Sequence, residues 1–274
     1  MNNPTISSTV AAIALCVGAA SAGAQSDQRL VVPLSDPSRP AILEIHLFMG
    51  DIRIQAYEGN EVLIVTDTPV RNADDDEEDE PRADGLRKIQ SSSVGITVEE
   101  GDNTVSLRTD FSNRNVDIDV SVPRRTSVRA NLITGDIAMT GVTGEHELAS
   151  VNGDVLATDI TGSAVINSTN GDVRVILNEI DADRPMSFTS FNGDVDVSLP
   201  ANLAADLIVA SQQGDVFTDF DVEVQQDPAV VERNRGAGGR YRVRMQRETR
   251  YSIGGGGPDI QLRTFNGDVM IRKR

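Results

Sequence analysis

Apolar and polar residues alternate along most of the chain in short runs of about six residues, and most runs end at a glycine. In the run at 173–177, valine and leucine hold the odd positions and arginine and isoleucine the even ones. The run at 116–122 alternates without a break and ends at Pro123, where a strand can stop. Only the stretch at 200–206 is helix-like, and the strand-like residues 206–210 follow it at once. The pattern therefore predicts an all-β protein.

A Gly-Asp pair followed by alternating apolar residues recurs along the chain. Its glycines are Gly50, Gly135, Gly153, Gly171, Gly193, Gly214 and Gly267. The spacing from Gly135 to Gly214 is 18, 18, 22 and 21 residues, which is regular enough to indicate a structural repeat. Asn-Gly pairs accept positive φ, so they mark tight turns. The predicted turn residues are Asn152, Gly153, Asp154, Asn170, Gly171, Asp172, Asn192, Gly193, Asp194, Asn266, Gly267 and Asp268.

Repeats of 18–22 residues with two turns each can stack in two ways. In a single-stranded β-solenoid each repeat is one coil, and equivalent strands pair in parallel between coils. In an antiparallel meander or sandwich, neighbouring strands would form hairpins instead. The near-constant period and the repeated turn chemistry favour the solenoid. Only 4% of the residues are aromatic and none is tryptophan, which suits a narrow interior filled by aliphatic side chains.

The first 24 residues have the features of a secretory signal peptide. They carry no charged side chain, contain an apolar run at 10–20 that is too short to span a membrane, and end in the small residues Ala22 and Ala24. We therefore expect an exported protein, placed in the periplasm, in the outer envelope or outside the cell, with no transmembrane span after cleavage. The only cysteine is Cys16, so the processed chain would have no disulfide, reactive thiol or cysteine-bound metal.

The predicted organisation is a signal peptide at 1–24, an N-terminal extension at 25–40 and a β-strand-repeat domain at 41–274. Two stretches interrupt the repeats. The segment at 72–84 holds eight acids and one base, Arg82, so we expect a disordered loop. The segment at 225–239 is polar and ends in glycines, which predicts a second loop.

An arginine-rich strand is expected at 240–247, with Arg240, Arg242 and Arg244 on one face. These arginines could form a solvated strand face, bind an anionic partner or hold the acidic loop.

The repeats resemble a bacterial family of β-strand-repeat proteins known as putative adhesins and classed as a domain of unknown function. The resemblance rests on strands that end in Asn-Gly-Asp-Val, on the segment VDIDVSVPRRTSVRANLITGDIAM and on SLPANLAADLIVASQQGDV. It covers about residues 41 to 274 apart from the two loops. The resemblance implies an architecture, and the family's motifs carry no established catalytic residues. It therefore assigns no functional role to any residue of this chain.

The charge balance and the candidate chemistry narrow the function. A net charge of −17 argues against nucleic acid, which needs a basic surface. The aspartates of the repeats, among them Asp136 and Asp215, could cap their own turns or bind calcium weakly, with Asp154, Asp172 and Asp194 as the candidates. His46 and His146 are expected at polar or outward strand positions, because neither has a partner at ligand spacing.

No cofactor is predicted, and no catalytic constellation is visible. The sequence thus favours a non-enzymatic cell-envelope protein with an adhesin-like or structural role, whose ligand would be a glycan, a lipid or a protein. A polysaccharide-cleaving enzyme on the same scaffold and an envelope-stress accessory protein are the alternatives.

Overall fold

A computed structural model describes residues 28–66, 70–71, 95–109, 115–225, 230–235, 241–246 and 249–274. The predicted signal peptide at 1–24 and the acidic loop at 72–84 lie outside the described residues. Within the part of the chain that is described, no helix is long and apolar enough to cross a membrane.

All regular elements of the described chain are strands, so the all-β prediction is confirmed. The strands of the first half are β1 (Gln28–Pro33), β2 (Ala41–Met49), β3 (Ile52–Tyr57), β4 (Glu61–Thr66), β5 (Val70–Arg71), β6 (Ile96–Gly101), β7 (Thr104–Thr109), β8 (Ile118–Pro123), β9 (Thr126–Thr134), β10 (Ile137–Thr140) and β11 (Thr143–Asn152). Those of the second half are β12 (Val155–Asn170), β13 (Val173–Ile180), β14 (Met186–Asn192), β15 (Val195–Leu199), β16 (Ala205–Ser211), β17 (Val216–Thr218), β18 (Glu223–Gln225), β19 (Val230–Arg235), β20 (Tyr241–Gln246), β21 (Thr249–Ile253), β22 (Asp259–Asn266) and β23 (Val269–Lys273).

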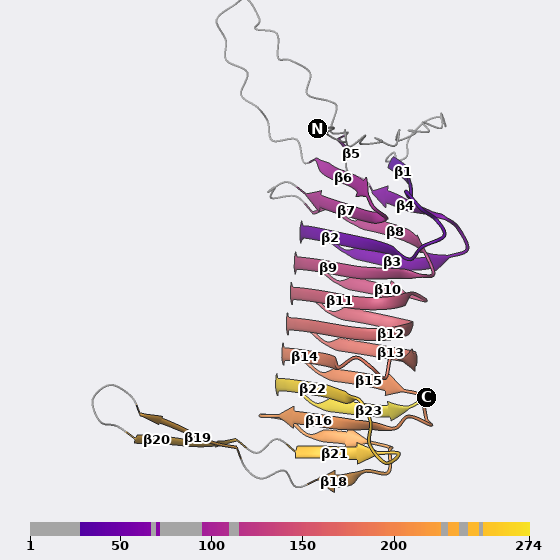
Figure 1. Cartoon of the computed structure of the whole chain (residues 1–274). Helices are drawn as coiled ribbons and strands as arrows, with labels where there is room; N and C mark the ends of the chain where they lie inside the picture. Colours follow the sequence, from indigo (N-terminus) through magenta and orange to yellow (C-terminus); the bar gives the residue numbers. More distant parts are fainter. Residues whose placement is uncertain are drawn as a thin grey trace, which may run out of the picture.

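The strands form a tall stack with two faces (Figure 1). One, here called the long-strand face, runs β7, β2, β9, β11, the second half of β12, β14, β22 and β16, with every neighbouring pair parallel. The other, the short-strand face, runs β8, β3, β10, the first half of β12, β13, β15, β23 and β17, again parallel throughout. A long strand, a sharp corner and a short strand thus make one layer.

Neighbouring central layers are one sequence repeat apart. Ile137 pairs with Val155 and His146 with Ala164, in each case 18 residues along the chain. This parallel register is compatible with stacked coils and differs from the antiparallel hairpins of the alternative arrangement.

The order of the layers differs from the order of the chain at both ends of the stack. The C-terminal strands β22 and β23 lie between the β14–β15 layer and the β16–β17 layer. The C-terminus therefore lies beside the stack rather than at its end (Figure 1). Likewise, β2 and β3 lie between the β7–β8 layer and the β9–β10 layer. In both places a strand pair that comes early or late in the chain becomes an inner layer.

Antiparallel strands cover the two ends of the stack. At one end β6 pairs with β7, and β4 pairs with both β1 and β8. At the other end β21 pairs with β16 and β18. Pairing with these strands protects edges that would otherwise be free to bind another chain.

The interior consists of columns of aliphatic side chains, because the in-register pairing places equivalent residues above one another. One column on the long-strand face contains, from layer to layer, Ile45, Ala130, Leu148, Ile166, Phe188, Leu262 and Val209. All of these side chains are at most 4% exposed. The scarcity of aromatic residues thus matches a thin core built mainly from Val, Ile and Leu.

Two predicted boundaries change in the structure. The N-terminal extension at 25–40 contains β1, which pairs with β4 and buries Leu30 and Val32 in the core. The polar loop at 225–239 contains β19, which forms a two-stranded ribbon with β20. The first segment contains a strand because it pairs with β4, which lies far away in the sequence. The second contains a strand because it pairs with β20, on the other side of a glycine-containing connection.

Candidate functional site

The Asn-Gly-Asp segments form the corner at which each long strand turns into a short strand. Gly153 has φ +153°, and a Cβ atom built on it would lie 1.9 Å from the backbone oxygen of Gly135 in the layer above. Gly171 repeats this geometry, with φ +154° and 2.2 Å to the oxygen of Gly153. Glycine is required here for two reasons. The backbones of adjacent layers are in contact, which leaves no room for a Cβ atom, and glycine accepts the positive φ.

The aspartates that follow these glycines form a hydrogen-bonded ladder across the layers. The Oδ1 atom of each aspartate accepts a hydrogen bond from the backbone N–H of the aspartate in the next layer, for example from Asp172 to Asp154 over 2.8 Å. In spatial order the ladder contains Asp117, Asp51, Asp136, Asp154, Asp172, Asp194, Asp268 and Asp215, with distances of 2.7–3.1 Å. The carboxylates therefore connect layers rather than cap their own turns, because the next layer presents an N–H group at the same height.

Two further ladders flank the aspartates. The asparagine amides donate to each other, as from Asn170 Nδ2 to Asn152 Oδ1 over 2.9 Å. Hydroxyls two residues earlier donate to the glycine carbonyl of the neighbouring layer, as from Ser168 Oγ to Gly153 O over 2.9 Å. The corners at Gly153, Gly171, Gly193 and Gly267 are thus bonded in sequence through backbone, amide, hydroxyl and carboxylate groups, which makes this edge of the stack stiff.

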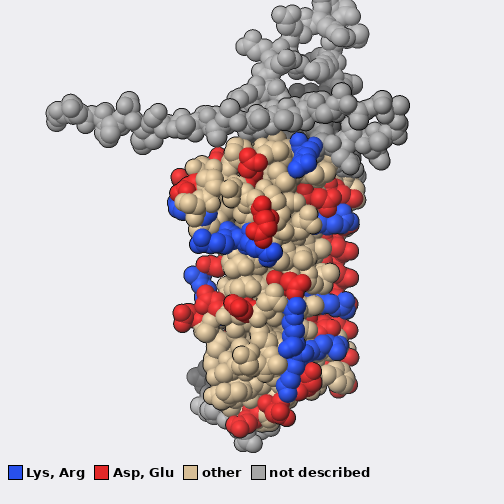
Figure 2. All heavy atoms as spheres, turned by 90° about the vertical axis from the view of Figure 1, so that its right-hand side faces the viewer, with Lys and Arg blue, Asp and Glu red and all other residues tan. Residues whose placement is uncertain are grey.

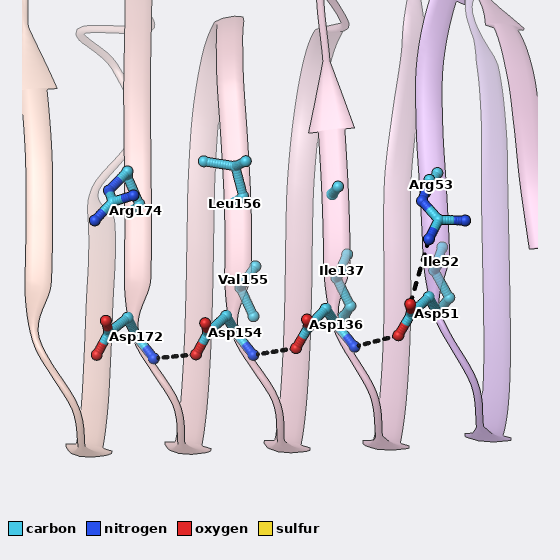
Figure 3. A pocket seen from close by; sticks show the side chains of 11 residues that line it. Asp51, Ile52, Arg53, Asp136, Ile137, Asp154, Val155, Leu156, Asp172 and Arg174 are labelled. Atoms are coloured by element: carbon cyan, nitrogen blue, oxygen red, sulfur yellow. Dashed lines mark hydrogen bonds and ion pairs between the residues drawn. The ribbon is translucent and has the colours of Figure 1, made fainter. Parts of the chain in front are cut away.

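A groove of about 300 Å³ runs beside four aspartates of the ladder, on the outside of the short-strand face (Figure 3). Asp51, Asp136, Asp154 and Asp172 form one rim. Ala138 and Leu156 belong to the lining, and Leu156 is 38% exposed. Arg53 and Arg174 also line it, one towards each end (Figure 3).

The groove combines acceptors, donors and an apolar surface. The ladder uses Oδ1 of each carboxylate, and among the described residues none donates a hydrogen bond to Oδ2 of Asp136, Asp154 or Asp172. Arg53 Nη2 lies 3.3 Å from Asp51 Oδ2, and Arg174 Nε lies 3.8 Å from Asp196 Oδ2. This arrangement suits a polar ligand that offers hydroxyl groups at intervals.

The calcium candidates Asp154, Asp172 and Asp194 lie in one column, one layer apart. Calcium takes six to eight oxygen ligands around one point. Within the described residues, no group of three or more His, Cys, Asp or Glu side chains is arranged to hold a metal ion. Calcium binding at these aspartates therefore remains a hypothesis.

The two histidines differ in position. His46 is exposed on the long-strand face, as predicted. The prediction for His146 is wrong, because its side chain is only 3% exposed and lies in a core column between Val128 and Ala164. Neither ring nitrogen has a hydrogen-bond partner among the described residues. Burial lowers the pKa of His146 to about 4, although the backbone carbonyls of Val142 and Thr161 oppose the shift.

The arginine-rich strand corresponds to β20, whose backbone pairs Arg244 with Glu232 and Arg242 with Asn234. Arg240 lies outside the described residues, as do the side-chain positions of the other two arginines. Anion binding there stays a prediction.

Sequence reasoning missed two parts of the site. Asp117 belongs to the ladder but follows Val116 instead of glycine, so it is not part of any Gly-Asp pair in the sequence. The hydroxyl ladder was also missed, although a serine stands two residues before each asparagine at Ser150, Ser168 and Ser190. Reading the repeat as Ser-x-Asn-Gly-Asp would have found it.

Comparison with known proteins gives a matching family and two solved structures with limited similarity. The Toastrack DUF4097 family matches residues 24–248. A solved structure described as a putative cell adhesion protein from Clostridium sporogenes is 10% identical, with a TM-score of 0.37, covering 91% of this chain and 100% of that one. A putative adhesin from Bacteroides fragilis is 12% identical, with a TM-score of 0.39, covering 92% and 98%. No curated protein matches the chain by sequence.

Proposed function

The chain belongs to the Toastrack DUF4097 family, and from this premise we propose that it is an exported, non-enzymatic protein of the cell envelope with an adhesin-like role. Its proposed ligand is a hydroxyl-rich polymer such as a surface glycan, held along the groove beside the aspartate ladder. The processed protein would begin near Gln25 and act in the periplasm, in the outer envelope or outside the cell.

The proposal includes the finer description of the fold as a β-solenoid. The parallel pairing at an 18-residue interval supports it, since each repeat supplies one long and one short strand to the stack. Such a stack is rigid along its length because every layer is bonded to the next. A rigid rod can present binding groups at fixed intervals to an extended ligand.

The observation that carries the proposal is the groove itself. Its aspartates stand one layer apart, which is about 4.8 Å between neighbouring strands. Their Oδ2 atoms can accept hydrogen bonds from ligand hydroxyls, and Arg53 and Arg174 can donate to ligand oxygens. Leu156 offers an apolar surface for the C–H groups of a sugar ring.

Two measurements test this function. Cell fractionation with amino-terminal sequencing should place the protein outside the cytoplasm, starting near Gln25; cytoplasmic protein that keeps Met1 would contradict export. A screen of glycans and envelope-lipid vesicles should then find a glycan whose binding is lost in Arg174→Ala. Phe217→Ala, a change on the same face but away from the groove, is the matched control.

The same screen separates the alternatives. Release of reducing ends from a bound polysaccharide would show an enzyme and overturn the non-enzymatic role. Binding that survives Arg174→Ala and Leu156→Asp would move the ligand away from this groove.

A further inference from the structure

Six outward side chains form a column of exposed or half-buried, mostly apolar residues along the long-strand face. This column is here called the apolar band, and its members from β2 to β22 are Phe48, Ile133, Val151, Thr169, Phe191 and Phe265. Phe48 and Ile133 are each 43% exposed, Val151 39% and Phe191 49%. The rings of Phe191 and Phe265 stack with centroids 4.8 Å apart. Single exposed apolar residues are ordinary, whereas a continuous row across six strands indicates an interaction surface.

From β2 to β22, the two columns of described residues that flank the apolar band contain no acid. The column on one side runs from His46 to Arg263, and the corner column on the other side runs from Met49 to Asn266. Neither column holds an Asp or Glu, although 42 of the 274 residues are acidic. A surface that is depleted of charged residues and carries exposed aromatic rings is typical of the centre of a protein interface.

The other half of the same face is charged. Arg129 lies 3.1 Å from Glu44 and 4.0 Å from Glu147, on neighbouring strands. Acidic and basic side chains also run together along one edge of the side drawn in Figure 2. The uncharged character of the apolar band is therefore a local feature and does not reflect a weakly charged protein.

The apolar band has a different shape at its two ends. Towards β2 it borders a shallow groove of about 500 Å³, whose lining includes Phe48, Ile133 and Val151. Towards β22 the exposed ring of Phe191 stacks on the half-buried ring of Phe265. One end is thus hollow and the other carries a pair of stacked rings.

We infer that the apolar band is the surface through which two copies of this chain associate. A two-fold axis along the strands, between β11 and β12, reverses the order of the layers in the second copy. The stacked rings of each copy then enter the groove of the other, with Phe191 opposite Ile133 and Phe265 opposite Phe48. Such an interface is self-complementary, because each contact occurs twice.

Charge restricts where two copies of this chain can approach each other. Two molecules of net charge −17 repel each other over most of their surfaces. The apolar band is a surface on which they can approach without opposing carboxylates. A second copy in addition has the same layer spacing, so its side chains stay in step over all six strands.

The surface area of the apolar band indicates a weak dimer. Six strands at about 4.8 Å give a length of about 29 Å, and the three columns are about 14 Å wide, so each copy contributes about 400 Å². The total of about 800 Å² lies below the ~1,200 Å² of stable complexes. The dimer is therefore weak and reversible, and it strengthens with salt as the mutual repulsion is screened.

Sedimentation velocity of the purified protein from about 5 µM to about 500 µM tests this inference. We expect a monomer–dimer equilibrium that shifts towards the dimer in higher salt. Phe191→Glu should weaken association at least about tenfold, because it buries an unpaired charge in the interface. Phe217→Glu, the same substitution at a ring that is 52% exposed on the short-strand face, is the matched control and should behave like the unaltered protein.

A paired variant tests the two-fold arrangement. Ile133→Lys combined with Phe191→Glu in one chain should restore dimers, because each lysine would face a glutamate of the second copy. A protein that stays monomeric at every concentration and salt level overturns the inference, as does an equal effect of Phe217→Glu. Monomers whose binding to lipid vesicles depends on Phe191 would also overturn it and assign the apolar band to a membrane surface. None of these results depends on glycan binding, so the proposed function is tested separately.

Discussion

Replacing Gly171 by alanine should destabilise the stack by about 3–4 kcal/mol, because no space separates the two layers at this corner. A Cβ atom on residue 171 would lie 2.2 Å from the oxygen and 2.5 Å from the carbon of the Gly153 carbonyl, whereas ordinary contact begins near 3.4 Å. Both neighbours are backbone atoms, so the clash cannot be relieved by a side-chain rotation. The two layers would have to separate by about 1 Å.

The cost follows from the bonds that cross this plane. Gly153 N donates to Asn170 O over 2.9 Å, Val155 N to Asp172 O over 2.9 Å, and Asp172 N to Asp154 Oδ1 over 2.8 Å. Lengthening them by about 1 Å breaks all three, at a net cost of about 1 kcal/mol each. The φ of +154° at Gly171 adds up to about 1 kcal/mol for a residue with a Cβ atom.

Two other glycines separate these contributions. Gly255 has φ +91° and no atom within 4 Å of its Cβ position, so Gly255→Ala should cost about 1 kcal/mol from the backbone alone. Gly101, at the end of β6, is not at positive φ and has no atom within 4 Å of its Cβ position, so Gly101→Ala should change stability by less than about 0.5 kcal/mol.

Urea unfolding followed by far-ultraviolet circular dichroism provides the measurement. We expect the stability of the variants to fall in the order Gly101→Ala, Gly255→Ala, Gly171→Ala. If Gly171→Ala costs no more than Gly255→Ala, the layers can move apart freely and the argument from close packing is wrong.

Two further predictions concern His146 and the aspartate ladder. The folded-state pKa of His146 is about 4, below the ordinary 6.5, so the unfolded chain takes up the proton first and stability should fall as the pH drops from 6.5 towards 4. By pH 5 the protein should have lost about 2 kcal/mol of stability. Urea unfolding at several pH values should show a smaller loss in His146→Leu than in the unaltered protein. Equal pH profiles for the two proteins would contradict a buried neutral imidazole. At Asp172, Asp172→Ala should cost about 1–2 kcal/mol in urea unfolding by leaving the N–H of Asp194 unpaired, whereas Asp172→Asn keeps the Oδ1 acceptor and should cost much less. A calcium-dependent rise in melting temperature that Asp172→Asn abolishes would instead support the ligand hypothesis.

Much of the architecture could be read from local patterns. Alternation with a period of two residues predicts strands, and the recurrence of Asn-Gly-Asp every 18–22 residues predicts equivalent corners. Both signals lie within a single repeat, so no knowledge of distant residues is needed. The phase of the alternation also held the answer for His146, because it shares its face with Leu148, which is buried.

The sequence predicts only part of what the recurring Asn-Gly-Asp residues do. The sequence marks Asp154 and Asp172 as turn residues, but it does not show that each carboxylate bonds the next layer. That bond depends on a backbone N–H supplied by another repeat at a distance fixed by parallel pairing. The groove beside the ladder likewise exists only once Arg53 and Arg174 stand on the same face.

The tertiary structure alone decides the order of the layers. All the Gly-Asp repeats look alike, so the sequence does not reveal that Gly267 stacks on Gly193 or that Gly214 stacks on Gly267. Nor does it show that β2 and β3 lie inside the stack. Pairing between equivalent strands has nearly the same local energy in any order. What selects one order is the covering of the end layers by the antiparallel strands β1, β4, β6, β18 and β21, which depends on contacts between distant parts of the chain.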